Sequence, residues 1–162
     1  MWCAMFRDGP ERFLVFGVGH ERFAVALSAV EEVIDVPPVQ PLPDAPRAML
    51  GIATLRGALV TLYDPHPFLN VEGTTRDAAL LFTRRAGEGD VDRRVGLVID
   101  ALFDPILVEP SDVRSAPGAG ASDRVLVGLV RRDSELIAIL DAEALLDAAM
   151  GVASSEAHGE RT

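Results

Sequence analysis

Short apolar runs separated by turn residues dominate the chain, and this pattern is typical of β-strands. The runs Phe13–Val18 and Phe23–Leu27 flank a polar turn that contains a glycine, which predicts an antiparallel hairpin. A second hairpin is predicted from Gly51–Leu55 and Ala58–Tyr63, with the turn at Arg56-Gly57. These two hairpins make the first half of the chain predominantly β.

The second half repeats this order of elements. Strands are predicted at Ala78–Arg84 and Val95–Asp100, and a last hairpin at Val125–Val130 and Leu136–Leu140. Apolar residues at helical spacing then predict a helix over Asp141–Met150, with Asp141 as its N-cap.

Two connections in the first half interrupt the strand pattern. Ser28 and Glu31 have the spacing of a capping box and would begin a helical turn, but a strand beginning at Val30 fits the same residues equally well. Five prolines between Asp35 and Arg47 exclude regular structure there and predict an extended connection.

The two halves align at an offset of about 75 residues, too long for a solenoid repeat. Gly51 corresponds to Gly128 in this alignment, and Asp64 corresponds to Asp141. Many short strands between turn signals favour an all-β class with a minor helix. The repeat therefore predicts a duplicated small β-barrel.

The composition argues against several classes of protein, among them nucleic-acid-binding, disulfide-rich and membrane-spanning proteins. A hydrophobic fraction of 49% in 162 residues supports a sizeable core, and the net charge of -10 argues against a nucleic-acid partner. One cysteine excludes a disulfide framework within the chain. We identify no secretory signal and no apolar segment near the ~20 residues that span a bilayer. The expected protein is soluble and cytoplasmic, with no direct membrane insertion.

Catalytic patterns are absent from the sequence. No serine lies in a nucleophile elbow, no glycine loop is suited to phosphate, and no residues have metal-ligand spacing. His20, His66 and His158 are all expected at the surface. We therefore expect no enzyme, cofactor or metal. The rival from another class is a small hydrolase or ligand-binding barrel, which requires a deep pocket holding His20 or His66 beside a carboxylate.

Arg56 is the strongest candidate for a binding role, because a core does not need an arginine at a hairpin turn within an apolar stretch. Packing of the first hairpin beside the second would let Glu32 pair with Arg56. The pair would be either a surface salt bridge or a charged feature of a docking surface. Gly51 and Gly57 similarly indicate either turn chemistry or close approach of a partner backbone.

Several segments together resemble the CheW-like chemotaxis coupling family. Residues 51–64, GIATLRGALVTLYD, are similar to the family's G-x-x-N-L-R-G-x-x-x-P-x-x-D segment. The opening FLVF at residues 13–16, the VEEV at residues 30–33 and the VGLVIDALFD at residues 95–104 resemble further family motifs in the family's order. Residues 128–146 resemble its last hairpin and helix.

This resemblance implies two intertwined five-stranded β-barrels and a C-terminal helix. It implies an N-terminal extension at residues 1–12, a CheW-like domain at 13–150 and a flexible tail at 151–162. Its function would be a non-catalytic adaptor that links the cytoplasmic tip of chemoreceptors to the regulatory domain of a CheA-type histidine kinase. The resemblance places partner contacts at the following positions or beside them: Val30, Glu32, Gly51, Leu55, Arg56, Gly57, Asp104 and Pro105.

Four residues depart from the family pattern. Thr54 replaces the usual asparagine, and Thr61 replaces the usual proline. His66 stands where the family's D-L-R has its cation, and Pro105 stands where an apolar residue is usual. These departures leave open an alternative, a divergent coupling protein that binds receptors but not the kinase and tunes array activity.

Overall fold

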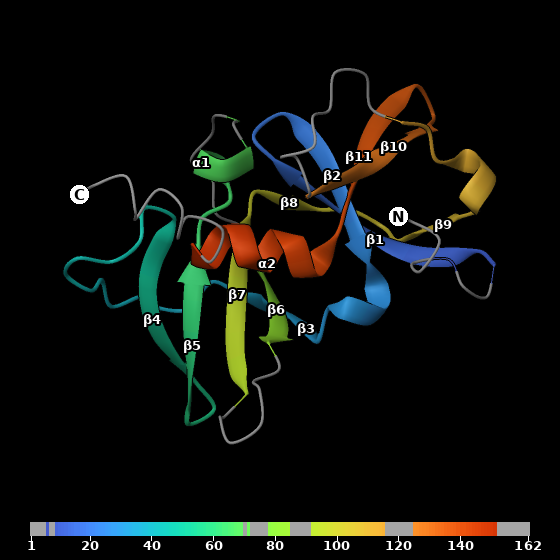
Figure 1. Ribbon diagram of the computed structural model, residues 1–162. Coiled ribbons are helices and arrows are strands. Elements are labelled where there is room, and N and C mark those ends of the chain that lie inside the picture. The colour runs from blue at the N-terminus through green and yellow to red at the C-terminus, as the bar shows by residue number, and fades with distance from the viewer. Residues whose placement is uncertain are drawn as a thin grey trace.

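The computed structural model describes residues 6, 9–69, 71, 78–84, 92–115 and 125–151. Its strands form two sheets that lie side by side (Figure 1). Sheet A consists of β1 (Glu11–Val18), β2 (Glu21–Ala26), β8 (Ala101–Leu102), β9 (Ile106–Val108), β10 (Leu126–Arg132) and β11 (Glu135–Leu140). Sheet B consists of β3 (Glu32–Asp35), β4 (Met49–Leu55), β5 (Ala58–Tyr63), β6 (Ala78–Arg84) and β7 (Arg93–Ile99).

The described residues include two α-helices, and each follows a hairpin. The short α1 (His66–Leu69) comes after β4–β5, and α2 (Ala142–Met150) comes after β10–β11. The predicted cap of the last helix is confirmed, because the Asp141 carboxylate accepts a hydrogen bond from the Ala144 N–H at 3.1 Å. Gly151 ends α2 in the left-handed conformation. The predicted tail beyond it and His158 lie outside the described residues.

After β2 the chain forms a helical turn and then a strand, so both of the alternatives considered for this segment are present, one after the other. A 3-10 helix spans Leu27–Ala29, and β3 begins only at Glu32. The predicted capping box is wrong, since Ala26 is the N-cap residue and makes no side-chain cap bond. The carboxylate of Glu31 instead accepts hydrogen bonds from Thr83 and Arg94.

The halves of the chain are intertwined, as the family resemblance implies. Sheet A combines the β1–β2 hairpin of the first half with the β10–β11 hairpin of the second, and sheet B combines β4–β5 with β6–β7. Each sheet joins its two hairpins through a parallel pair, β2 with β11 and β5 with β7. Each half also gives a strand to the other half's hairpin, because β3 pairs with β6 and β9 pairs with β1.

The β4–β5 and β10–β11 hairpins repeat each other in detail. Both contain a register shift at a glycine, Gly51 in β4 and Gly128 in β10, and their residues alternate between core and surface in the same order. The duplication read from the sequence is thus present in the backbone as well as in the motifs.

The predicted barrels differ from the observed sheets in two respects. Sheet A has six strands, because the short β8 also pairs with β1. Neither sheet is closed by a continuous ladder among the described residues. Each sheet has instead one isolated bridge to a neighbouring connection, Gln40 to Ile52 in sheet B and Arg114 to Leu129 in sheet A. Prolines explain the difference in sheet B, because Pro37 and Pro38 lack the N–H donors that a continuous ladder needs.

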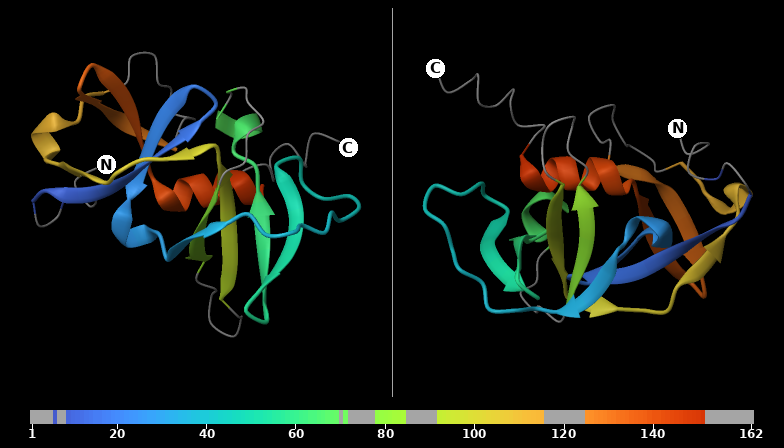
Figure 2. Two further views of the ribbon diagram at one scale, coloured as in Figure 1. Left: turned by 180° about the vertical axis from the view of Figure 1, so that it is seen from behind. Right: turned by 90° about the horizontal axis from the view of Figure 1, so that it is seen from below.

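The largest core cluster lies between the sheets. It contains Phe16 and Phe23 from sheet A, Leu80 and Leu97 from sheet B, and Leu145 from α2. Figure 2 shows α2 lying across the junction of the two sheets in both views. The helix therefore covers the space where the two halves of the fold meet.

Candidate partner-binding site

Arg56 occupies a turn that does not require an arginine. The β4–β5 hairpin reverses at Arg56 and Gly57, whose φ angles are 49° and 82°. Two-residue turns with positive φ at both positions favour Asn or Asp followed by Gly, because a longer side chain is strained there. Gly57 fits this preference and Arg56 does not. The arginine is therefore explained by what its side chain contacts and not by the turn.

The predicted pair between Arg56 and Glu32 is confirmed. The Arg56 guanidinium donates from Nη2 to both carboxylate oxygens of Glu32 at 2.5 Å. Glu32 lies on β3 and Arg56 follows β4, and these strands form the opposite edges of sheet B. The pair thus joins the two edges of a curled sheet. With 58% of the Arg56 side chain exposed, its contribution to stability is about 0–1 kcal/mol.

A second arginine makes a comparable pair next to the first. Arg94 on β7 donates to Glu31 at 3.0 Å, and Thr83 on β6 donates to the same carboxylate at 2.8 Å. The hydrogen bonds from Thr83 and then from Arg94 lower the pKa of Glu31. Sheet B therefore carries two neighbouring arginine–glutamate pairs, and only that of Arg56 involves the hairpin turn.

The two glycines of the hairpin have different surroundings. Gly51 is buried with φ at 146°, and the Gln40 backbone lies against it. Gly57 is exposed, and nothing lies within 4 Å of where a Cβ would stand. Gly51 therefore shapes the hairpin from inside, whereas Gly57 is available at the surface.

The remaining predicted residues divide between the two sheets. Val30 and Leu55 are half-buried, Val30 against the core cluster between the sheets and Leu55 against the core of sheet B. Asp104 and Pro105 are exposed in the β8–β9 connection of sheet A. The structure thus brings Glu32 and Arg56 into contact, while Asp104 and Pro105 belong to the other sheet.

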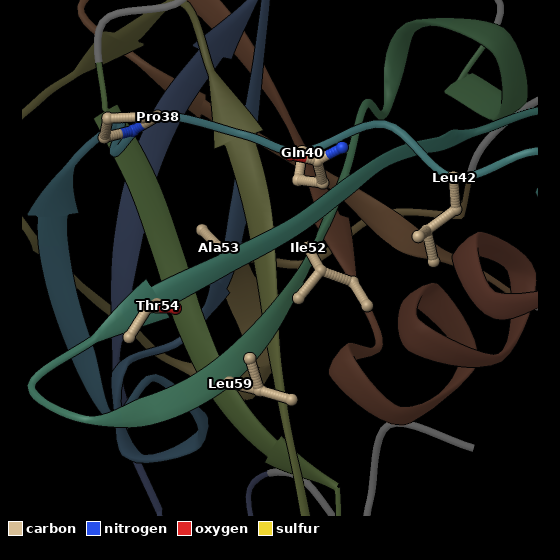
Figure 3. Close-up of a pocket in the computed structure, with 7 residues that line it drawn as sticks. All are labelled: Pro38, Gln40, Leu42, Ile52, Ala53, Thr54 and Leu59. Atoms are coloured by element: carbon tan, nitrogen blue, oxygen red, sulfur yellow. The ribbon is translucent and has the colours of Figure 1, made fainter.

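An apolar pocket next to the Arg56 hairpin was not predicted. It measures about 480 Å³, and Figure 3 shows its lining on β4, on β5 and on the proline-rich connection: Pro38, Gln40, Leu42, Ile52, Ala53, Thr54 and Leu59. Leu59 is 68% exposed and pairs across the hairpin with Thr54. Strand alternation was the available signal, because buried Val60 and Leu62 require that Leu59 point outward.

The prediction of a surface position for His66 is wrong. The residue is 8% exposed, its Nδ1 lies 2.5 Å from Asp64 Oδ1, and its Nε2 lies 3.0 Å from Asp100 Oδ2. Two carboxylates at the ends of neighbouring strands draw the ring inward, whereas His20 is exposed as predicted. A buried histidine beside a carboxylate is part of what the hydrolase rival requires. Here carboxylates occupy both ring nitrogens, so neither nitrogen is free to serve as a base.

Comparisons with known proteins agree with this architecture. The model of the CheW-like domain family matches residues 12–150. The chain is 31% identical over 113 residues to the chemotaxis protein CheW of Rhizobium meliloti, covering 68% of this chain and 69% of that protein. It is 26% identical over 137 residues to CheW of Treponema pallidum, covering 83% and 81%.

A solved structure has the same fold. The scaffolding protein TtCheW of Thermoanaerobacter tengcongensis superimposes with a TM-score of 0.67 at 21% identity, covering 81% of this chain and 88% of that one. The chain belongs to the CheW-like domain family. It is accordingly a non-catalytic adaptor of the chemotaxis type, which removes the hydrolase rival. No helix in the described part of the chain is long and apolar enough to cross a membrane.

Proposed function

We propose that this chain is a cytoplasmic coupling adaptor of a chemosensory array. It binds the cytoplasmic tip of chemoreceptors and the regulatory domain of a CheA-type histidine kinase, and it has no nucleic-acid partner. The observation that carries the proposal is Arg56, an exposed arginine at a strained turn position that neither the turn nor the core requires. Family membership supplies the class of partner.

The surroundings of Arg56 support a binding role. The apolar pocket and exposed Leu59 lie on the same hairpin, so a charged and directional group stands beside an apolar surface. Interfaces commonly place arginine and apolar anchors together, because the apolar contacts exclude water from the charged one. The Glu32 carboxylate holds the guanidinium in place, which lowers the entropy lost when a partner binds.

Replacing Arg56 with alanine tests this role. We expect Arg56→Ala to weaken binding to the receptor tip or to the kinase regulatory domain at least tenfold, which corresponds to about 1.4 kcal/mol. Titration calorimetry of the purified chain against each partner separately measures the effect. The free energy of unfolding should change by no more than about 1 kcal/mol, because the ion pair is exposed.

Arg94→Ala is the matched control. It removes the same charge and breaks the neighbouring pair with Glu31, but it leaves the hairpin turn intact. Its affinity for both partners should stay within about twofold of the original chain, a change of ~0.4 kcal/mol. Equal losses in the two variants would mean that net charge, and not the position of Arg56, controls binding. Unchanged binding by a folded Arg56→Ala variant would remove Arg56 from the proposed site.

A second candidate function is a coupling protein that binds receptors but not the kinase. Pro105 favours it, because it is exposed at the β8–β9 connection and cannot donate a backbone hydrogen bond to a partner. His66 no longer supports this candidate, since its buried ring is not available to a partner.

If the original chain binds the receptor but not the kinase domain, the Pro105→Val variant tests this candidate. Valine restores an N–H donor and an apolar side chain, so we expect measurable kinase binding, with receptor binding unchanged. Co-elution with each partner in size-exclusion chromatography measures this binding. Kinase binding by the original chain would eliminate this candidate before any substitution is made.

A further inference from the structure

His66 lies where the two sheets are joined. Asp64 directly follows β5, and Asp100 stands between the last residue of β7 in sheet B and the first of β8 in sheet A. The Asp100 N–H donates to the Gly17 carbonyl of β1 at 2.9 Å. Asp100 Oδ2 also accepts from the Gly19 N–H in the β1–β2 turn at 2.5 Å. The ring therefore contacts both the end of sheet B and the residue that fastens it to sheet A.

The contacts favour one protonation state of the ring. A neutral imidazole carries one N–H, so it can donate to only one of two carboxylates, and its other nitrogen would direct a lone pair at the second. Both ring nitrogens lie within hydrogen-bonding distance of carboxylate oxygens, which suits a doubly protonated ring. The arrangement is also shielded from water, because the exposed fractions of the side chains are 9% for His66, 20% for Asp64 and 10% for Asp100.

Charge balance points the same way. Among the described residues, the groups that contact the ring are the carboxylates of Asp64 after β5 and Asp100 after β7, and the β1–β2 turn contributes a backbone N–H to Asp100. Within the described residues, Asp100 Oδ1 is buried without a hydrogen-bond partner. Beside a neutral ring, the shielded Asp100 carboxylate would have no cationic partner among the described residues, whereas an imidazolium supplies one.

We propose that His66 is a proton-controlled clasp, whose doubly protonated ring ties the ends of β5 and β7 to the β1–β2 turn and whose deprotonation loosens this junction of the two sheets. The clasp belongs to the architecture of this chain and does not depend on which partners the adaptor binds.

The direction of the pH dependence follows from linkage. Burial lowers the pKa of His66, and the hydrogen bonds to Asp64 and then Asp100 raise it by more, so that it lies above its ordinary value of 6.5. The unfolded chain has the ordinary value, so the contribution of the clasp is fully present below pH 6.5. It is lost as the pH rises through the folded value. Each unit between the two values changes the folding equilibrium constant about tenfold.

Nuclear magnetic resonance titration of the full chain tests the proposal. Following the His66 ring signals from pH 5 to 9, we expect a midpoint above 6.5 and nitrogen shifts of a doubly protonated ring below it. The folding equilibrium constant from urea denaturation should fall over the same pH range. Protection of the Gly19 amide from hydrogen exchange, corrected for the intrinsic rate, should decrease as well. A midpoint at or below 6.5, or unchanged Gly19 protection, overturns the clasp.

Three variants separate the clasp from other histidines and from simple loss of structure. Asp100→Asn keeps the shape of the side chain but removes its charge, so the His66 midpoint should move toward 6.5. His66→Arg carries a permanent charge, and a folded variant should lose the pH dependence of folding in this range. His20→Gln removes the exposed histidine of the adjacent turn and should keep it. An unchanged midpoint in Asp100→Asn, or a His20→Gln variant without pH dependence, contradicts the proposal.

Discussion

Gly51→Ala is expected to destabilise this chain by about 4 kcal/mol, because the substitution combines backbone strain with a steric overlap. The φ angle of 146° at Gly51 lies in a region that residues with a Cβ rarely adopt. An added Cβ would overlap the Gln40 carbonyl oxygen, and it would stand 2.7 Å from the Gln40 carbonyl carbon and 2.8 Å from Val39 Cγ1. Backbone atoms cannot move aside as a flexible side chain can.

The Gly51→Ala substitution would disturb the isolated bridge between Gln40 and Ile52 in sheet B. The Gln40 N–H donates to the Ile52 carbonyl at 2.8 Å, and the Ile52 N–H donates back to Gln40 at 2.9 Å. Moving Gln40 away from a new Cβ would break both bonds. The free energy of unfolding from urea denaturation measures the effect, and a loss of this size is a large part of the ~5–15 kcal/mol of a typical domain.

Gly57→Ala is the matched control for Gly51→Ala. Gly57 belongs to the same hairpin and also has a positive φ, but a Cβ there would enter open space. Its cost should be limited to the conformational term of about 1 kcal/mol. If both variants lost the same stability, the backbone conformation alone would account for Gly51, and the approach of Gln40 would carry no energy.

The hydrophobic pattern predicted the strands and the last helix well, because the residues that define each hairpin are neighbours in the sequence. The β10–β11 hairpin could be read from apolar runs on either side of a polar turn, and the cap at Asp141 from a local rule. The fold class was predicted correctly, but the two barrels are sheets that no continuous ladder closes, since closure depends on whether Gln40 and Arg114 make one bridge or a ladder. In sheet B that outcome follows from Pro37 and Pro38, which have no N–H to donate to a ladder.

The candidate site was predictable where a local anomaly marked it. Arg56 stood out because its residue type did not suit its position, and its partner Glu32 followed from the expected packing of hairpins. His66 could not be found in this way. Asp64 and Asp100 are distant in the sequence. They lie close together because β5 and β7 are parallel neighbours, so their C-terminal ends lie on the same side of sheet B. Only knowledge of that pairing would have predicted a carboxylate on each side of the ring.

Leu145→Ala is expected to destabilise the chain by about 2–5 kcal/mol, the range for removing a buried leucine side chain. Leu145 is fully buried on α2, in the cluster that contains side chains from both sheets. The lost atoms leave a cavity between the halves of the fold, where neither sheet can collapse without disturbing the other. Urea denaturation gives the free energy, and coincident transitions by different probes show whether the chain unfolds as one unit.

The outcome of Leu145→Ala bears on how the halves are held together. Leu136→Ala makes the same chemical change at a side chain that is 54% exposed, so it should cost less than about 1 kcal/mol. A comparable loss in the two variants would show that α2 contributes little to the junction. A large loss with coincident transitions would mean that the helix couples both sheets into one cooperative unit. Arg56 in sheet B and Pro105 beside sheet A would then belong to one folding unit whose stability depends on a helix far from either residue in the sequence.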